Sequence, residues 1–191
     1  MLISLGSNCC IAWQLKKHNH RSESFPFDWS KITLDQLIQV LENDFKNYSK
    51  LQIKKFSENH LHLDNNSGSY ILYNAYNITF AHELLCKDNI DILETKIENR
   101  IRKFKELINP TFIRIETNVI KNTNNYNILM ELLKKYFTNF TLIIISTIKP
   151  NILYDNFIHY KINDFNADWK YDNLDWNQIF NGSRTENNYN C

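Results

Sequence analysis

The feature that most constrains the fold is a strand–helix–strand pattern in the second half of the sequence. Residues 111–116 (TFIRIE) are predicted to form a strand, residues 125–137 a helix, and residues 140–147 (FTLIIIST) a further strand. Because the run at 140–147 is apolar on both faces, it is typical of a central strand in a parallel sheet that helices cover on both sides. The pattern therefore predicts an α/β fold.

Other segments extend this pattern in both directions. An apolar run at residues 2–5 ends in a Gly-Ser-Asn turn, and a helix is predicted to begin near Cys9. Thr33 and Gln36 have the spacing of a capping box, which predicts a second helix from Thr33. The remaining predicted elements are a helix over residues 90–108 with a Glu98–Arg102 pair, two short strands within residues 69–81 of which the second covers Ile78–Ala81, and a strand over residues 157–162.

We expect one domain over residues 1–180, followed by a disordered tail over residues 181–191. A chain of 191 residues is long enough for one sizeable core and too short for two comfortable domains. The expected architecture is a central mixed, mostly parallel sheet flanked by helices, with a papain-like α+β arrangement as the alternative.

Composition excludes several classes of function. The net charge is +1, which removes the main electrostatic reason to bind nucleic acid or an anionic membrane. The apolar runs are all shorter than the ~18–20 residues that span a bilayer. Glycines occur only at positions 6, 68 and 182, which excludes glycine-rich phosphate loops. We therefore expect no cofactor, no nucleic-acid partner and no membrane insertion, and the sequence leaves the oligomeric state open.

The cysteine spacing and the N-terminal residues indicate the cellular compartment of the protein. The four cysteines lie at positions 9, 10, 86 and 191, a spacing that fits neither a disulfide framework nor a zinc ribbon. The start, MLISLGSNCC, lacks the basic and long apolar regions of a signal peptide. Reduced thiols in the cytoplasm, or in the host cytoplasm if the protein is viral, are the expectation.

Cys9 is the first candidate for a catalytic residue. It follows an apolar strand and a tight turn at the predicted start of a helix, where free backbone N–H groups and the helix dipole favour an anion. Such a position can lower the pKa of a thiol, most strongly beside an imidazolium. The same N–H groups could stabilise an oxyanion, and Ser7 or Asn8 could cap the helix or add a donor. The structural alternative is that Cys9 and Cys10 are small residues packed into the core.

His82 is the candidate base. It follows a predicted strand, and in parallel sheets functional groups gather at the carboxyl ends of strands, so its imidazole and the Cys9 thiol could converge. The candidates for a third member are Asp28, Glu116 and Asn118. The structural alternative is a histidine whose ring is satisfied by local hydrogen bonds.

Two further sets of residues admit more than one role. Arg114 lies in the middle of a predicted strand, where it could hold a substrate carboxylate or pair with Asp28 or Glu116. His60 and His62 would share one face of a strand and could bind a metal with His82. Because this histidine pair has no matching cysteine or carboxylate at metal-site spacing, we expect no metal.

A set of short motifs runs through the first two thirds of the sequence: Ser4-Leu5-Gly6-Ser7-Asn8-Cys9, then Ala12, Leu15 and Arg21, then Pro26-Phe27-Asp28-Trp29, and in mid-chain Phe80-Ala81-His82-Glu83 and Phe112-Ile113-Arg114. In these motifs the chain resembles a family of papain-like cysteine peptidases found in bacteria and in large DNA viruses. The resemblance covers residues 3–30 well and residues 78–116 loosely. It implies Cys9 rather than Cys10 as the nucleophile, His82 as the base, and Asp28 and Arg114 as residues that line or support the site.

Two positions depart from the family pattern. Glu83 stands where many members carry aspartate, which weakens any direct role for that acid. The better-known papain-like enzymes carry a glutamine before the cysteine, whereas here Asn8, Ser7 or a backbone N–H would have to form the oxyanion hole.

Two functions follow from these observations. The first is a cysteine peptidase, or a related thiol hydrolase or acyltransferase, that acts on a peptide or protein through Cys9 and His82. The second is a non-catalytic α/β binding module, a viral or bacterial host-interaction factor in which Trp29, Trp169 and Trp176 form the contact surface.

Overall fold

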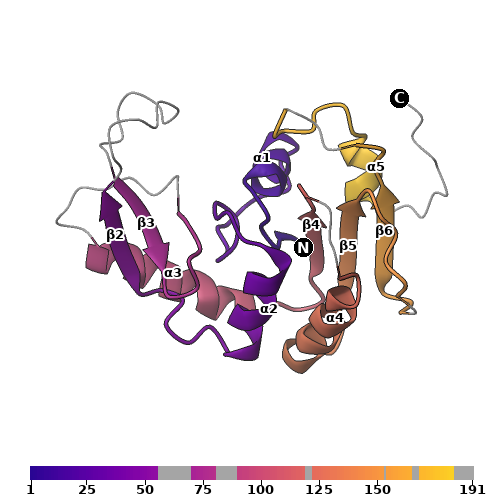
Figure 1. The fold of residues 1–191 in the computed structure, drawn as a ribbon. Coiled ribbons are helices and arrows are strands. Elements are labelled where there is room, and N and C mark those ends of the chain that lie inside the picture. The colour runs from indigo at the N-terminus through magenta and orange to yellow at the C-terminus, as the bar shows by residue number, and fades with distance from the viewer. Residues whose placement is uncertain (56–69, 81–89, 119–121, 153, 165–167, 183–191) are drawn as a thin grey trace.

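The computed structural model describes residues 1–191 apart from 56–69, 81–89, 119–121, 153, 165–167 and 183–191. Its main sheet has four parallel strands in the order β1 (Leu2–Ser4), β4 (Thr111–Ile115), β5 (Thr141–Ser146) and β6 (Phe157–Lys161). A separate two-stranded antiparallel sheet pairs β2 (Leu51–Lys55) with β3 (Tyr70–Asn74) (Figure 1). The α/β fold is confirmed, but the central sheet is wholly parallel rather than mixed.

Helices cover both faces of the parallel sheet, as the apolar run in β5 predicts. Along β4 the side chains alternate: Ile113 and Ile115 pack with α1 (Cys10–Lys17) and α5 (Trp176–Phe180). Phe112 belongs to the larger core on the other face, which also takes in α2 (Leu34–Glu42), α3 (Ile90–Lys105) and α4 (Asn125–Tyr136). In the part of the chain that is described, every helix is too short or too polar to cross a bilayer.

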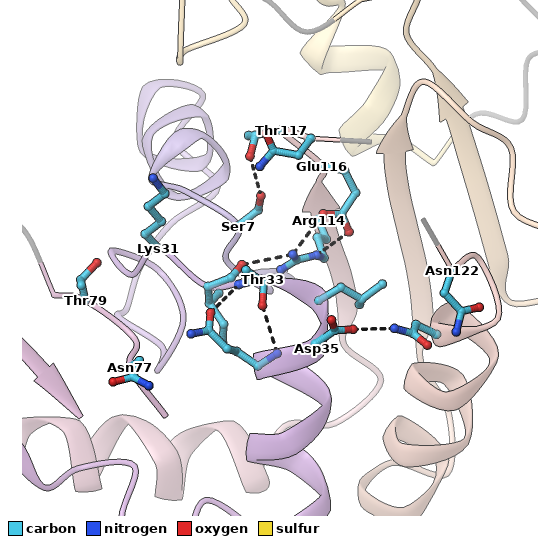
Figure 2. Close-up of a pocket in the computed structure, with 15 residues that line it drawn as sticks. Ser7, Lys31, Thr33, Asp35, Asn77, Thr79, Arg114, Glu116, Thr117 and Asn122 are labelled. Carbon is cyan, nitrogen blue, oxygen red and sulfur yellow. Dashed lines mark hydrogen bonds and ion pairs between the residues drawn. The ribbon is translucent and has the colours of Figure 1, made fainter. Parts of the chain in front are cut away.

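The parallel arrangement brings the ends of β1 and β4 to one edge of the sheet. Ser7 follows β1 and Thr117 follows β4, and their hydroxyl oxygens lie 3.4 Å apart (Figure 2). Functional groups that follow successive parallel strands meet at such an edge. The N-terminal turn of α2 lies beside it (Figure 2).

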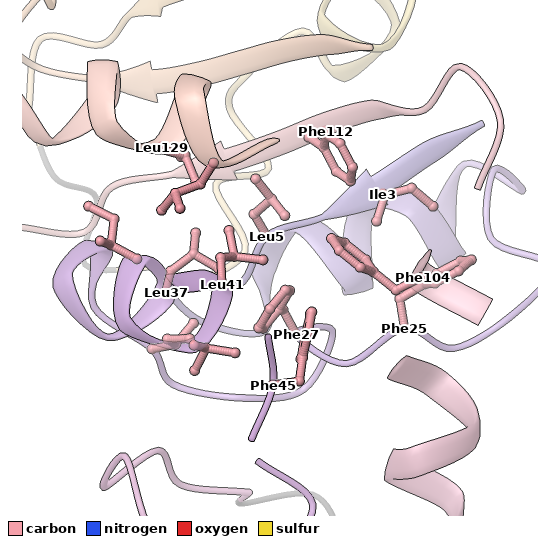
Figure 3. Packing of buried hydrophobic residues seen from close by; sticks show 14 of the residues in the cluster. Ile3, Leu5, Phe25, Phe27, Leu37, Leu41, Phe45, Phe104, Phe112 and Leu129 are labelled. Carbon is pink, nitrogen blue, oxygen red and sulfur yellow. The ribbon is translucent and has the colours of Figure 1, made fainter. Parts of the chain in front are cut away.

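An aromatic cluster connects the two sheets. Phe27, in the connector between α1 and α2, packs on Phe45 and Phe104 with ring centroids 5.6 and 5.7 Å apart (Figure 3). The ring of Tyr48 lies 5.6 Å from Phe27 and 5.9 Å from Phe80, which follows β3. The Tyr48 hydroxyl donates to the carbonyl of Pro26 at 2.9 Å. The connector and the antiparallel sheet are thereby held together through a chain of rings.

Most predicted elements are present, with local differences. Thr33 and Gln36 form the predicted capping box, whereas the predicted Glu98–Arg102 pair is wrong, because Arg102 pairs with Glu106 at 3.0 Å. The predicted strand at Ile78–Ala81 is also wrong within the described residues, where Thr79 forms only isolated bridges to Tyr73 and Lys31. Strand β2 and helix α5 were not anticipated.

Candidate active site

A pocket of about 500 Å³ opens at the carboxyl ends of β1 and β4. Its other walls are the N-terminal turn of α2, the segment after β3 and the residues that lead into α4 (Figure 2). The structure brings four of the predicted site residues into this lining: Ser7, Arg114, Glu116 and Asn118. Cys9, Asn8 and Asp28 do not line it.

The turn after β1 has an unusual backbone that fixes where the chain enters α1. Gly6 and Ser7 have φ values of 77° and 84°, both in the left-handed region that favours glycine. A Cβ atom on Gly6 would lie 2.3 Å from Cγ2 of Ile32, so only glycine fits. The Gly6 N–H donates to Oγ of Ser4 at 3.1 Å. Ser7 holds a strained conformation, a kind that concentrates at functional sites.

Cys9 lies at the N-terminal end of α1, as predicted, and its side chain is partly exposed. The Asn8 side chain accepts from the Cys10 N–H at 2.9 Å and so satisfies one free N–H group at this end of the helix, whose N-cap residue, Cys9, makes no side-chain cap. Burial raises the pKa of the Cys9 thiol to about 11, which is the opposite of the lowering that the sequence suggests. A thiolate at Cys9 therefore needs a nearby cation.

Cys10 differs from its neighbour although both are free thiols. Its side chain is fully buried, and its thiol donates to the carbonyl of Lys170 at 3.3 Å. Burial, reinforced by the negative charges of Asp172 and Asp168, raises the pKa of Cys10 as well. Cys10 is therefore a core residue, as the structural alternative proposed for both cysteines.

Arg114 pairs with Glu116 beneath the pocket. Nε of Arg114 donates to Oε1 of Glu116 at 2.6 Å, and a terminal nitrogen donates to Oε2 at 3.1 Å. The remaining donors reach the carbonyls of Leu5 at 3.0 Å and Ile32 at 3.1 Å. The Tyr126 hydroxyl also donates to Glu116, at 3.2 Å, and burial together with the carboxylate charge raises the pKa of Tyr126. Of the two roles left open for Arg114, the geometry favours pairing with Glu116.

Asp28 is held by the connector itself. Its carboxylate accepts from Nε and a terminal nitrogen of Arg21 at 3.2 and 3.0 Å and from the Phe25 N–H at 2.9 Å. Burial raises the pKa of Asp28, against the lowering effects of the Phe25 N–H and Arg21. Asp28 is only 2% exposed, so it organises the connector rather than lining the pocket.

His82, Glu83, His60 and His62 fall outside the described residues, so the predicted thiolate–imidazole pair remains a prediction. The chain is well fixed just before this point. The Lys31 N–H donates to the carbonyl of Thr79 at 3.2 Å, and the Phe80 N–H donates to the carbonyl of Leu72 at 3.0 Å. Among the residues that are described, no group of three or more histidine, cysteine, aspartate or glutamate side chains could hold a metal ion.

Several lining residues were not anticipated from the sequence. Thr117 directly follows Glu116 after β4, so the rule that selects Glu116 could have found it. Lys31, Asn77 and Thr79 reach the pocket because the segment before α2 pairs with the segment after β3. No local sequence signal predicts that pairing, because the two segments are far apart in the chain.

Comparison with known proteins identifies a family. The family described as "Putative papain-like cysteine peptidase (DUF1796)" matches residues 1–149. Over 94 residues the chain is 33% identical to the "Uncharacterized protein R408" of Acanthamoeba polyphaga mimivirus. That match covers 44% of this chain and 42% of the viral protein, less than half of either. No solved structure matches the chain significantly.

Proposed function

The chain belongs to the family of papain-like cysteine peptidases matched over residues 1–149, and on this premise we propose that it is a thiol hydrolase in which Cys9 is the nucleophile and His82 the base. The bond attacked is an amide or isopeptide bond in a peptide or protein. The family and the position of Cys9 at the start of α1 support this role.

One observation carries the proposal: the segments that lead to both residues line the same pocket. Ser7 lies two residues before Cys9, and Thr79 lies three residues before His82. Two residues of chain span at most about 7 Å and three span at most about 11 Å. These short tethers support the proposal that both groups reach one solvent-accessible site, as a nucleophile and its base must.

The reaction would proceed in two steps. The Cys9 thiolate attacks the carbonyl carbon of the substrate amide, and the resulting oxyanion accepts hydrogen bonds from backbone N–H groups of the first turn of α1 other than that of Cys10, which donates to Asn8. Protonated His82 gives its proton to the leaving amine as the C–N bond breaks, which leaves a thioester on Cys9. His82 then takes a proton from water, which attacks the thioester and releases the carboxylic acid and the Cys9 thiolate, so that the thiolate–imidazolium pair is restored.

Because burial raises the pKa of Cys9, the proposed mechanism requires His82 to stabilise the thiolate. With a pKa of about 11, roughly one thiol in ten thousand is ionised at pH 7. An imidazolium within a few ångströms favours the thiolate and can lower the pKa of a cysteine by several units. In this proposal the His82 imidazolium offsets the burial of Cys9, and the site works as an ion pair.

The proposed location follows from the thiols. Cys9 and Cys10 are both free, and reducing surroundings protect a reactive thiol from oxidation. We therefore place the activity in the cytoplasm, or in the host cytoplasm for a viral protein.

Alkylation of the folded protein by iodoacetamide tests the proposal, with peptide mass spectrometry to follow each cysteine separately. We expect Cys9 to react at least ten times faster than Cys86 at pH 7, and buried Cys10 to be protected as the adjacent control. Equal and slow labelling of all four cysteines would reject the thiolate. It would favour the alternative of a non-catalytic binding module.

A further inference from the structure

The pocket beside Cys9 is built mainly from uncharged polar side chains. Its volume of about 500 Å³ falls within the usual range of ligand sites. Asparagine amides and threonine hydroxyls supply much of its lining, which includes Asn77, Asn118, Asn122, Asn125, Thr79 and Thr117. Because Cys9 does not line the pocket, the pocket suits the recognition of a group near the reacting bond rather than the reaction itself.

The charges in the lining cancel. Arg114 is paired with Glu116, and its guanidinium also donates to two backbone carbonyls. Lys31 and Asp35 contribute one charge of each sign, and Asp35 accepts from Nδ2 of Asn125 at 2.5 Å. A charged group placed here would lose hydration without gaining a net opposite charge, which is costly. The pocket therefore favours a neutral ligand.

Two of the amides are available to a ligand. Among the described residues, the side chains of Asn77 and Asn118 have no hydrogen-bond partner, and both are exposed. An amide offers a donor and an acceptor side by side. A second amide that faces it can satisfy both groups at once, whereas a carboxylate can only accept and an aliphatic group can do neither.

We infer that this pocket is the substrate subsite that selects an uncharged amide side chain, glutamine or asparagine, next to the bond that Cys9 attacks. The inference rests on the proposed thiol hydrolase function. Ser7 connects the subsite to the proposed nucleophile, because it lines the pocket and belongs to the turn that leads to Cys9 at the start of α1.

Peptidyl chloromethyl ketones that alkylate a catalytic thiol test this subsite. The probes are N-acetyl tetrapeptides of alanine in which one position in turn carries glutamine, glutamate or leucine. At one position we expect the glutamine probe to alkylate Cys9 at least ten times faster than its glutamate and leucine counterparts, the ratio that one good hydrogen bond supplies.

Variants assign the preference to the pocket. Asn118→Leu and Asn77→Leu should each reduce the ratio of the glutamine to the leucine alkylation rate several-fold. Asn151→Leu is the matched control, because Asn151 is exposed and outside the pocket, and it should keep the full preference.

The outcomes separate the two proposals. If iodoacetamide fails to single out Cys9, the hydrolase itself is rejected. If iodoacetamide selects Cys9 but the glutamine, glutamate and leucine probes react alike, only the amide subsite is rejected. A glutamine preference that survives both pocket substitutions would also overturn it, because the recognition would then lie elsewhere.

Discussion

The Arg114 guanidinium binds both oxygens of the Glu116 carboxylate, at 2.6 and 3.1 Å, and the two side chains are only 1% and 4% exposed. The same guanidinium reaches the carbonyl of Leu5, the residue before the Gly6–Ser7 turn. The pair thus ties the end of β4 to the turn that positions Cys9. The first prediction from this buried pair concerns the free energy of unfolding.

Arg114→Ala should lower the free energy of unfolding by about 3–5 kcal/mol, because it leaves the Glu116 carboxylate buried without a partner. The measurement is urea denaturation followed by circular dichroism. The double variant Arg114→Met with Glu116→Leu should lose clearly less, since it removes both buried charges. If the double variant is as unstable as the single one, the loss comes from the Leu5 and Ile32 carbonyls instead.

Gly6→Ala should destabilise the protein by about 2 kcal/mol or more, because it adds a clash to an unfavourable backbone conformation. The chain supplies its own control. Gly182 also has a positive φ, 63°, but a Cβ there would lie an ordinary 3.7 Å from Ile158. Gly182→Ala should therefore cost only the conformational part, about 1 kcal/mol. Equal losses in urea denaturation would show that the contact with Ile32 is relieved by small shifts.

The pH dependence of Cys9 alkylation reports on His82. In the unmodified protein the rate should rise through an apparent pKa below about 8, because the imidazolium favours the thiolate. In His82→Ala the inflection should move up toward the value of about 11 that burial alone gives Cys9. The reading is the iodoacetamide rate at Cys9 between pH 5 and 10. An unchanged profile in His82→Ala would show that another group acts on the thiol.

His159 should make the protein less stable in acid. Burial, with Lys149 next in effect, lowers the pKa of His159 to about 4, and its Nε2 lies 3.0 Å from Oγ of Ser146. The folded state therefore binds fewer protons than the unfolded state below pH ~6.5. Its stabilising contribution is complete above that pH and is lost as the pH falls toward 4.

The expected loss for the partly exposed His159 is about 1–2 kcal/mol between pH 7 and pH 4.5. Urea midpoints at four pH values measure it, and His159→Gln should flatten the slope by that amount. A slope that is the same in His159→Gln would place the acid sensitivity on other groups.

The elements that could be predicted are those whose signal is local. The β4–α4–β5 unit follows from apolar periodicity over residues 111–147, and the capping box of α2 from the spacing of Thr33 and Gln36. Strand β2 has the sequence LQIKK, in which three of the five side chains are polar, and it pairs with β3 along its whole length. Pairing between distant segments leaves little trace in either segment alone.

The lining of the pocket shows the same contrast between local signals and pairing of distant segments. Glu116 and Asn118 lie at the end of the predicted strand at residues 111–116, where functional groups gather, and both line the pocket. Ser7, predicted as a cap or donor at the start of the first helix, lines it as well. Asn77 and Thr79 follow no strand of the parallel sheet, so the rule for strand ends could not select them. Asp28 pairs with Arg21, seven residues earlier in the same connector, so it holds the connector and does not line the pocket.

The chain of aromatic rings described above links the turn before Cys9 to Phe80, the last described residue before His82. Phe27 lies directly beneath Gly6, Tyr48 joins Phe27 to Phe80, and Phe80 is two residues from His82. These ring contacts set the spacing of the Gly6–Ser7 turn and the segment that ends at Phe80, the two described segments from which Cys9 and His82 extend. Trimming Tyr48, which is not among the residues that line the pocket, would therefore change this spacing without removing a lining side chain.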